Sequence, residues 1–130
     1  MAKVYRRRNI QGYTVALSAE YTAMVCAETM WEAEGCAYDP IEATLKQNDV
    51  EDIDIHIIEE HRSYWVGDEY ELKLKVNMVI PVEAESYQDA WDCAVEFVEN
   101  ITMPEGIELE GTAQIDMTLA EEKAYLRRAM

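Results

Sequence analysis

Hydrophobic and polar residues alternate strictly in two long segments of this chain. Residues 13–27 and 70–84 place apolar side chains at every second position, while most positions between them are polar or charged. A period of two sustained over such a length is typical of a long β-strand with one buried face. Pro81 cannot donate a ladder hydrogen bond, so we expect a bulge or a local sheet edge there.

Each long strand is followed by the start of a predicted helix. Thr29 and Ser86 are suitable N-cap residues, and a carboxylate follows each of them three positions later, at Glu32 and Asp89. The second helix is expected over residues 87–101. Its apolar stripe, expected to pack in the core, consists of Ala90, Ala94, Phe97, Val98 and Ile101.

The first helix is expected to be interrupted. Gly35 weakens it, and Asp39 followed by Pro40 has the pattern of a fresh N-cap with proline at the first helical position. We therefore expect a break near Asp39 and a restart that continues to about Lys46.

A shorter strand is predicted after the first helix. Residues 53–57 alternate between isoleucine and polar residues, the strand is expected to continue to Val66, and Gly67 with Asp68 offers a two-residue hairpin turn. This turn predicts the register of the hairpin. It pairs Ile53 with Val82, Ile55 with Ile80, Ile57 with Met78 and Trp65 with Tyr70.

The last strand and a terminal helix complete the predicted elements. The inward-facing positions of the strand are expected to be Ile107, Leu109, Ala113, Ile115 and Met117. Thr118 and Glu121 form a third capping pattern, so residues 118–130 are predicted to form a short C-terminal helix.

The chain also contains an internal repeat. Residues 25–37 align with residues 82–94, and six of these thirteen positions are identical. We therefore expect one α+β domain over residues 13–117, made of two β-α-β repeats (13–66 and 70–117), after a basic arm at residues 1–12. This order resembles the ferredoxin-like split β-α-β plan, which implies an antiparallel sheet with both helices on one face and implies no activity.

Length and composition place the chain among globular proteins. It has 130 residues, with 49% hydrophobic residues and three cysteines. There is no apolar run long enough to span a membrane and no signal-peptide pattern, so we expect a cytoplasmic protein. Cys36 and Cys93 occupy the same repeat position and are expected to be small buried helix residues, whereas Cys26 falls on the polar face of its strand.

The charge of the chain is strongly negative and unevenly distributed. The net charge is −16, and all 27 acidic residues lie between Glu20 and Glu122. The basic residues gather at the two ends, including Arg6, Arg7 and Arg8. Such a field repels nucleic acid and anionic membranes and attracts basic surfaces. The alternative is that the acids serve solubility alone.

The sequence offers no convincing catalytic, cofactor or metal site. His56 and His61 differ by five positions, so on a strand they point to opposite faces and do not form a metal site together. No nucleophile has a supporting base, and there is no glycine-rich phosphate loop. We expect a protein that is not an enzyme and has no cofactor.

The charge pattern favours a binding protein. We expect it to occupy a basic surface of a partner protein, including the nucleic-acid channel of a nucleic-acid-binding enzyme, without binding nucleic acid directly. Small acidic inhibitors encoded by phages, such as anti-restriction and anti-CRISPR proteins, act in this way as a class. The alternative is a ferredoxin-like regulatory or small-ligand-binding module that dimerises. The expected partner-binding residues are Asp52, Asp54, Glu59, Glu60, Glu108, Glu110 and Asp116.

The length of the strands suggests self-association. A strand of about sixteen residues spans roughly 53 Å, whereas a helix of about fifteen residues is only roughly 22 Å long. The helices are therefore expected to leave one end of each strand uncovered, and a homodimer would bury it. The exposed residues would be Tyr13, Leu17, Trp65, Tyr70, Leu72 and Leu74.

Overall fold

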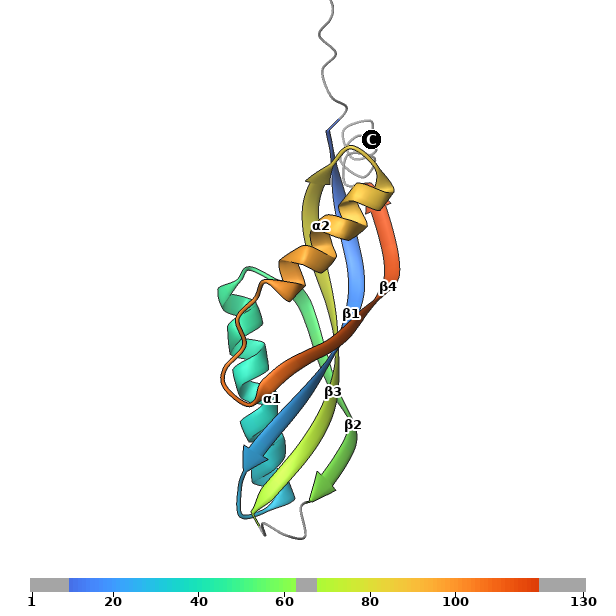
Figure 1. The fold of residues 1–130 in the computed structure, drawn as a ribbon. Helices are drawn as coiled ribbons and strands as arrows, with labels where there is room; N and C mark the ends of the chain where they lie inside the picture. Colours follow the sequence, from blue (N-terminus) through green and yellow to red (C-terminus); the bar gives the residue numbers. More distant parts are fainter. Residues whose placement is uncertain (1–9, 63–67, 120–130) are drawn as a thin grey trace, which may run out of the picture.

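The computed structural model describes residues 10–62 and 68–119. Its elements are β1 (Gln11–Cys26), α1 (Met30–Gln47), β2 (Glu51–Arg62), β3 (Glu69–Ala84), α2 (Tyr87–Glu99) and β4 (Ile107–Leu119). The four strands form one antiparallel sheet in the order β2-β3-β1-β4 (Figure 1). The predicted α+β class with an antiparallel sheet and two helices is confirmed.

The two long strands lie side by side in the middle of the sheet. The antiparallel register sets Tyr13 opposite Val82 and Val25 opposite Tyr70. Alternate side chains of both strands are buried, as the period of two predicts. The pairing of β2 with β3 stops at Val79, so Pro81 lies at a local edge of the sheet, as expected.

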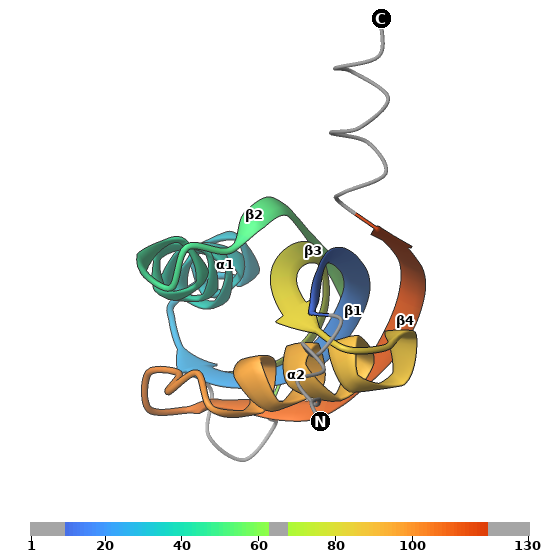
Figure 2. The same cartoon turned by 90° about the horizontal axis from the view of Figure 1, so that it is seen from above.

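The two helices cover opposite ends of this long sheet. α1 follows the end of β1 and contacts β1, β2 and β3, whereas α2 follows the end of β3 and contacts β3, β1 and β4 (Figures 1 and 2). Because β1 and β3 are antiparallel, these ends lie at opposite ends of the sheet. Buried side chains from both helices and all four strands form one hydrophobic core.

This arrangement removes the reason for expecting an uncovered apolar end. Tyr13, Val15, Leu17, Tyr70, Leu72 and Leu74 are each at most 3% exposed within one chain. The expectation that the helices leave them uncovered is wrong, because the antiparallel register places Tyr13 under α2 beside Val82 and Tyr70 near α1 beside Val25. Trp65 lies outside the described residues. Self-association therefore stays a prediction, without the support of an exposed apolar end of the strands.

α1 is one continuous helix, so the predicted break at Asp39 is wrong. Pro40 lies inside the helix and removes one backbone donor from it. The buried residues of α1 stand on both sides of the proline and pack into the same core: Ala33, Ala37, Ile41 and Leu45. Their contact with the sheet holds the two halves of the helix in line, which local propensity alone does not indicate.

The predicted stripe of α2 is confirmed only in part. Ala90, Ala94 and Val98 are buried, but Phe97 is 37% exposed and is not a core residue. Cys36 and Cys93 are also exposed, although they were expected to be buried. Cys26 is exposed as well, in line with its position on the polar face of β1. Alanine side chains let the helix approach the sheet closely, so that positions beside the alanine stripe are left outside the contact.

Both predicted N-caps are confirmed. The backbone N–H of Glu32 donates to Thr29 Oγ1 at 3.2 Å, and the N–H of Asp89 donates to Ser86 Oγ at 3.2 Å. Glu32 also reaches back, but its carboxylate accepts from the N–H of Glu28 at 3.2 Å instead of that of the cap residue. Each helix therefore begins where the sequence predicts.

The predicted register of the β2–β3 hairpin is wrong. Ile55 lies opposite Val76 instead of Ile80, and Ile57 lies opposite Leu74 instead of Met78. The prediction assumed a tight turn at Gly67 and Asp68, whereas β2 already ends at Arg62 and β3 begins at Glu69. Residues 63–67 lie outside the described residues. In the observed register Arg62 lies opposite Tyr70, the place predicted for Trp65, while Ile55 and Ile57 stay on the core side.

Two register shifts change which residues of β4 face the core. Gln114 and Asp116 face adjacent residues of β1, which leaves Ile115 as the extra residue of a bulge, and Glu110 is the extra residue of a second shift. Ala113 and Ile115 are consequently exposed, so their predicted core positions are wrong. Ile107 is buried, as predicted.

The predictions for the two ends of the chain are tested only at their borders. β1 begins at Gln11, inside the predicted arm of residues 1–12. Thr118 and Leu119 still belong to β4, so a helix does not begin at Thr118. The remainder of the predicted C-terminal helix and Arg6, Arg7 and Arg8 lie outside the described residues.

Candidate interaction surfaces

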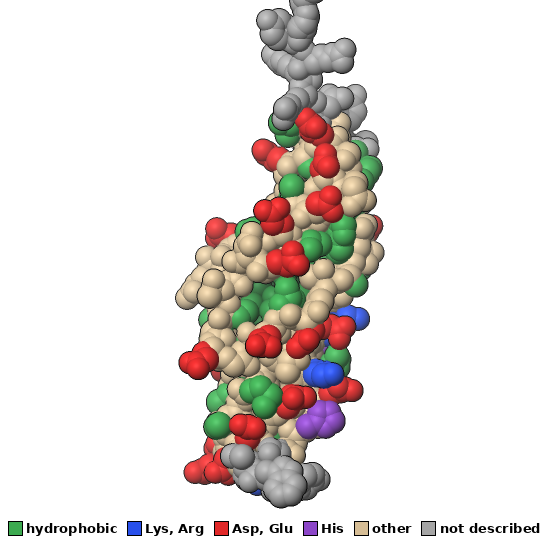
Figure 3. Space-filling view, in the orientation of Figure 1, with side chains coloured by type: hydrophobic (Ala, Val, Ile, Leu, Met, Phe, Trp, Pro, Cys, Tyr) green, Lys and Arg blue, Asp and Glu red, His purple; other side chains and the backbone are tan. Residues whose placement is uncertain are grey.

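The charged side chains divide the molecule into two flanks. Residues 76–119, which include the end of β3 together with α2 and β4, contain ten acidic residues and no lysine, arginine or histidine. We call this part the acidic flank. The bases of the described residues are Lys46, Arg62, Lys73 and Lys75, which all lie on α1, β2 and β3. Figure 3 shows acidic side chains along the length of the molecule and basic ones confined to one lower region.

Three of the predicted partner-binding residues lie on β4, within the acidic flank. Glu108, Glu110 and Asp116 are all exposed, and Glu110 stands at the bulge described above. Within the part of the chain that the structure describes, none of the three forms an ion pair. Their charge is therefore available to a partner.

The other four predicted residues lie on β2, at the opposite edge of the sheet. Asp52, Asp54, Glu59 and Glu60 are exposed, so all seven predicted residues are accessible. However, β3 and β1 separate β2 from β4, so the structure does not bring the two sets together. The predicted residues therefore form two surfaces instead of one.

The carboxylates on β2 have positively charged or titratable neighbours. Asp54 Oδ2 lies 2.7 Å from Nε2 of His56, and Glu59 Oε2 lies 3.4 Å from Lys73 Nζ and 4.0 Å from Nε2 of His61. The contact with Lys73 offsets part of the negative charge of this edge. Asp52 stands at a register shift with a φ of 51°, a left-handed conformation at a bulge.

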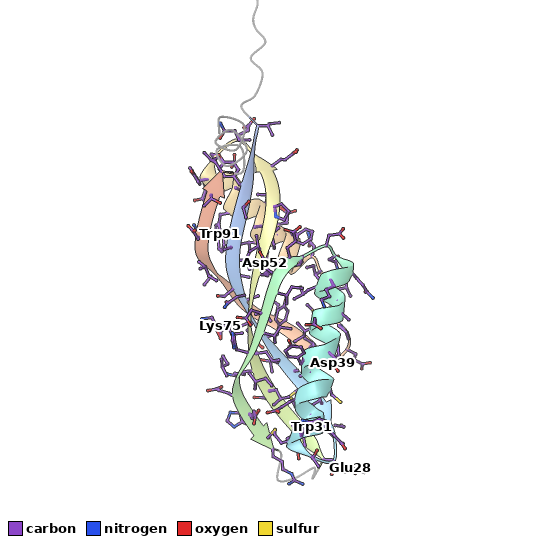
Figure 4. All side chains as sticks on the ribbon, turned by 180° about the vertical axis from the view of Figure 1, so that it is seen from behind. Glu28, Trp31, Asp39, Asp52, Lys75 and Trp91 are labelled. Carbon is purple, nitrogen blue, oxygen red and sulfur yellow. The ribbon has the colours of Figure 1, made fainter. Side chains whose placement is uncertain are left out.

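A hollow of about 830 Å³ lies beside α1 at the β2 edge. Its apolar lining comes from Trp31, Cys36, Tyr38, Pro40 and Ile57, with Gly35 between them, and its carboxylates are Glu32, Glu34 and Asp39. Trp31 is 81% exposed, the highest exposure among the large hydrophobic residues of the described chain. Figure 4 shows Trp31 and Asp39 along the same helix. We call this feature the aromatic hollow.

The acidic groups near the aromatic hollow repel one another. A hydrogen bond that protonated Glu60 donates to the carboxylate of Glu34, reinforced by slight desolvation and by the charge of Glu34, raises the pKa of Glu60. The charge of Glu42, followed by desolvation and by the charges of Asp54 and Asp39, raises the pKa of Tyr38. The hollow is therefore an electronegative site with aromatic walls.

A second hollow, on the acidic flank, has a different lining. It measures about 410 Å³, lies between the end of β3 and α2, and is lined by Ile10, Glu83, Ala84, Glu85, Asp89, Asp92, Cys93 and Glu96. It contains five carboxylates and no aromatic side chain. This hollow therefore combines a concentration of carboxylates with a small apolar lining from Ile10, Ala84 and Cys93.

The sequence predictions missed the aromatic hollow. Trp31, Gly35 and Tyr38 recur at positions i, i+4 and i+7, a helical face separate from the alanine stripe of α1. This spacing was the available signal. Gly35 enters the sequence predictions only as a residue that weakens the helix, so its place between two aromatic residues on one helical face was missed.

The described residues show neither a metal site nor a membrane span. No group of three or more His, Cys, Asp or Glu side chains among residues 10–62 and 68–119 is placed to hold a metal ion. Within the same ranges, no helix is long and apolar enough to cross a membrane. Neither the comparison with models of known protein families nor the comparison with curated proteins finds a match to this chain.

Proposed function

We propose that this chain is a non-enzymatic binding protein whose acidic flank occupies a basic surface of a partner protein. The observation that carries the proposal is the composition of residues 76–119, where ten acids and no base are spread over the end of β3, α2, β4 and the loops between them. A surface of one sign repels polyanions and accelerates association with cationic surfaces. Solubility alone does not require that one flank lack every positive charge.

The shape of the molecule supports a partner that normally holds nucleic acid. The sheet is long and narrow, and acidic side chains follow its length (Figures 1 and 3). A strand of about sixteen residues extends roughly 53 Å, which matches a channel for about fifteen base pairs at roughly 3.4 Å each. The proposed action is inhibition by occupying such a channel, as cytoplasmic anti-restriction and anti-CRISPR proteins of phages do as a class.

The test compares two matched charge reversals. The first combines Glu108→Lys and Glu110→Lys on the acidic flank, and the second combines Asp54→Lys and Glu59→Lys on β2, where His56 and Lys73 already lie close. Both change the net charge equally. The partner is captured on the immobilised wild-type chain, eluted with salt, identified and purified, and association rates are then measured at low and high salt.

The first reversal should slow association at low salt by about tenfold and reduce its salt dependence. The second should have a clearly smaller effect. Equal association rates for the wild-type chain and the first variant at low salt would reduce these acids to solubility residues and refute the proposal. Circular dichroism of both variants shows whether the fold is retained.

We further infer that the fold is a ferredoxin-like plan that arose by duplication of a β-α-β unit. The element order, the strand order β2-β3-β1-β4 and a single core beneath both helices support this inference. Thr29 and Ser86, which align in the repeat, cap the two helices in the same way. This origin implies no activity.

A second candidate function is a regulatory or small-ligand-binding module that dimerises. The aromatic hollow favours it, because its volume of about 830 Å³ lies within the usual range of ligand pockets. Native mass spectrometry of the purified chain distinguishes the two candidates. A small molecule retained by the wild-type chain and lost in Trp31→Ala supports the module, whereas a bare chain supports the protein-binding role.

A further inference from the structure

The aromatic hollow combines an exposed aromatic surface with a set of carboxylates. Trp31 exposes 81% of its surface, and the neighbouring apolar lining includes Tyr38, Pro40 and Ile57. Exposed apolar patches of this kind mark interaction sites. Three carboxylates, Glu32, Glu34 and Asp39, line the same hollow.

The corresponding position on α2 shows why the hollow is open. In the internal repeat, Glu34 aligns with Trp91. Trp91 packs against the hydrophobic core, whereas α1 has a carboxylate at that position and carries its tryptophan three residues earlier, at Trp31. Figure 4 shows the two tryptophans at different heights on the molecule. The tryptophan of α2 therefore packs against the core, whereas the tryptophan of α1 is exposed to solvent.

We propose that the aromatic hollow receives an arginine or lysine side chain from an extended basic segment of the partner protein. Trp31 and Tyr38 would hold the cation against their ring faces and its apolar stem against Ile57, while Glu34 and Asp39 supply the opposite charge. The inference rests on the proposed function, because it names the second point at which the same basic partner is held.

Charge complementarity selects this occupant over others. Glu34 lines the hollow and raises the pKa of Glu60, and a cation placed beside Glu34 offsets the repulsion between these carboxylates. An anionic ligand would meet three carboxylates, and a neutral apolar segment would leave them desolvated without a partner. Tryptophan gives the strongest cation–π contact of the aromatic residues, and Trp, Tyr and Arg dominate binding energy at interfaces.

The test uses a seven-residue peptide of alternating serine and arginine, and a control peptide in which neutral citrulline replaces arginine. Each is titrated into the full chain while the indole N–H signals of the three tryptophans are followed by NMR, with Trp31→Phe used to assign the signal of Trp31. Trp31→Ala and Glu34→Gln probe the hollow. Phe97→Ala and Glu96→Gln remove an exposed aromatic residue and a carboxylate from α2 as matched controls.

The arginine peptide should shift the Trp31 signal, and the citrulline peptide should not. In isothermal titration calorimetry, which does not need the Trp31 signal, Trp31→Ala should weaken binding of the arginine peptide by about five- to thirtyfold, and Trp31→Phe by less. Glu34→Gln should weaken it by about two- to fivefold at low salt. The two α2 variants should bind within about twofold of the wild-type chain.

Three outcomes would overturn the inference. Equal affinity for both peptides shows an apolar site without preference for a cation. Equal losses in Trp31→Ala and Phe97→Ala show that the hollow has no special role. A change of oligomeric state in Trp31→Ala, measured by sedimentation equilibrium, makes a second copy of the chain the occupant. If the hollow fails while the Glu108→Lys/Glu110→Lys variant still loses the partner, the proposed function stands without it.

Discussion

The two helical halves of this molecule use the same buried stripe and present different surfaces to solvent. α1 buries Ala33 and Ala37 beneath it, and α2 buries the aligned Ala90 and Ala94. On the first half, an exposed tryptophan and a hollow accompany every lysine and arginine of the described residues. On the second half, the tryptophan is packed inward and every charged residue is acidic.

The difference shows that fold and surface are determined by separate positions. A helix needs only its small and aliphatic stripe to dock on the sheet, so the flanking positions are free to change. A tryptophan at the position of Trp91 packs against the core, whereas a tryptophan at the position of Trp31 is an exposed aromatic group. The same plan therefore supports a site of mixed chemistry at one end and a charged surface at the other.

The largest expected difference separates a core residue of α1 from the exposed phenylalanine of α2. Leu45 is fully buried, so Leu45→Ala should lower the free energy of unfolding by about 2–5 kcal/mol. Phe97 is 37% exposed, and Phe97→Ala should cost less than about 1 kcal/mol. Denaturant melts measure both changes. A cost near 4 kcal/mol for Phe97→Ala would place this ring in the core after all.

These residues also show what the sequence can and cannot reveal about the fold. Strand alternation and the capping residues Thr29 and Ser86 are local signals, and they correctly predict the long strands and the starts of both helices. The exposure of Phe97 depends on how closely α2 docks on the sheet. The register of Ile55 depends on where the connection between β2 and β3 is centred. No local pattern encodes either. The bulges of β4 likewise depend on the neighbouring strand.

The candidate surfaces were predictable to different degrees. The exposure of all seven predicted acids follows from composition and alternation, and the structure agrees. Their separation onto two sheet edges depends on strand order, as does the contact of Glu59 with Lys73. The aromatic hollow joins α1 to Ile57 of β2, so it depends on how the helix docks on the sheet, which no local pattern encodes.

The second difference compares the two tryptophans directly. Trp91 is half-buried against the core, so Trp91→Ala should destabilise the protein by about 2 kcal/mol, roughly half the value for a fully buried tryptophan. Trp31→Ala should change stability by no more than about 0.5 kcal/mol. Thermal and denaturant melts of the two variants provide the measurement. Equal costs would mean that Trp31 serves packing, which would remove the structural argument for an open aromatic hollow.

The helix caps should differ little between the halves. Both Thr29 and Ser86 accept a backbone hydrogen bond at 3.2 Å, so Thr29→Ala and Ser86→Ala should each cost about 1 kcal/mol. Thr29→Ser provides a control that retains the acceptor and should lie near the wild-type value. Melts in which only one of the two alanine variants loses stability would show that the caps are not equivalent, although they align in the repeat.

The smallest expected effect concerns the pH dependence of the α1 half. The hydrogen bond that protonated Glu60 donates to Glu34, with desolvation and the like charge of Glu34, raises the pKa of Glu60 in the folded state above its ordinary value of 4.5. The folded state then binds the proton more tightly than the unfolded state does. The resulting stabilisation is fully present below the unfolded pKa and is lost as the pH rises through the folded pKa.

Glu60→Gln should therefore narrow the stability advantage that the wild-type chain gains on acidification toward pH 4.5. The comparison is made by denaturant melts of both chains at several pH values, with Glu96→Gln on α2 as a control of equal charge change. Glu34→Gln should have the same effect as Glu60→Gln, because either substitution removes the pair of carboxylates. A difference between the wild-type chain and Glu60→Gln that stays constant with pH would show that Glu34 and Glu60 do not interact in solution, and would leave the aromatic hollow without the repulsion that a bound cation relieves.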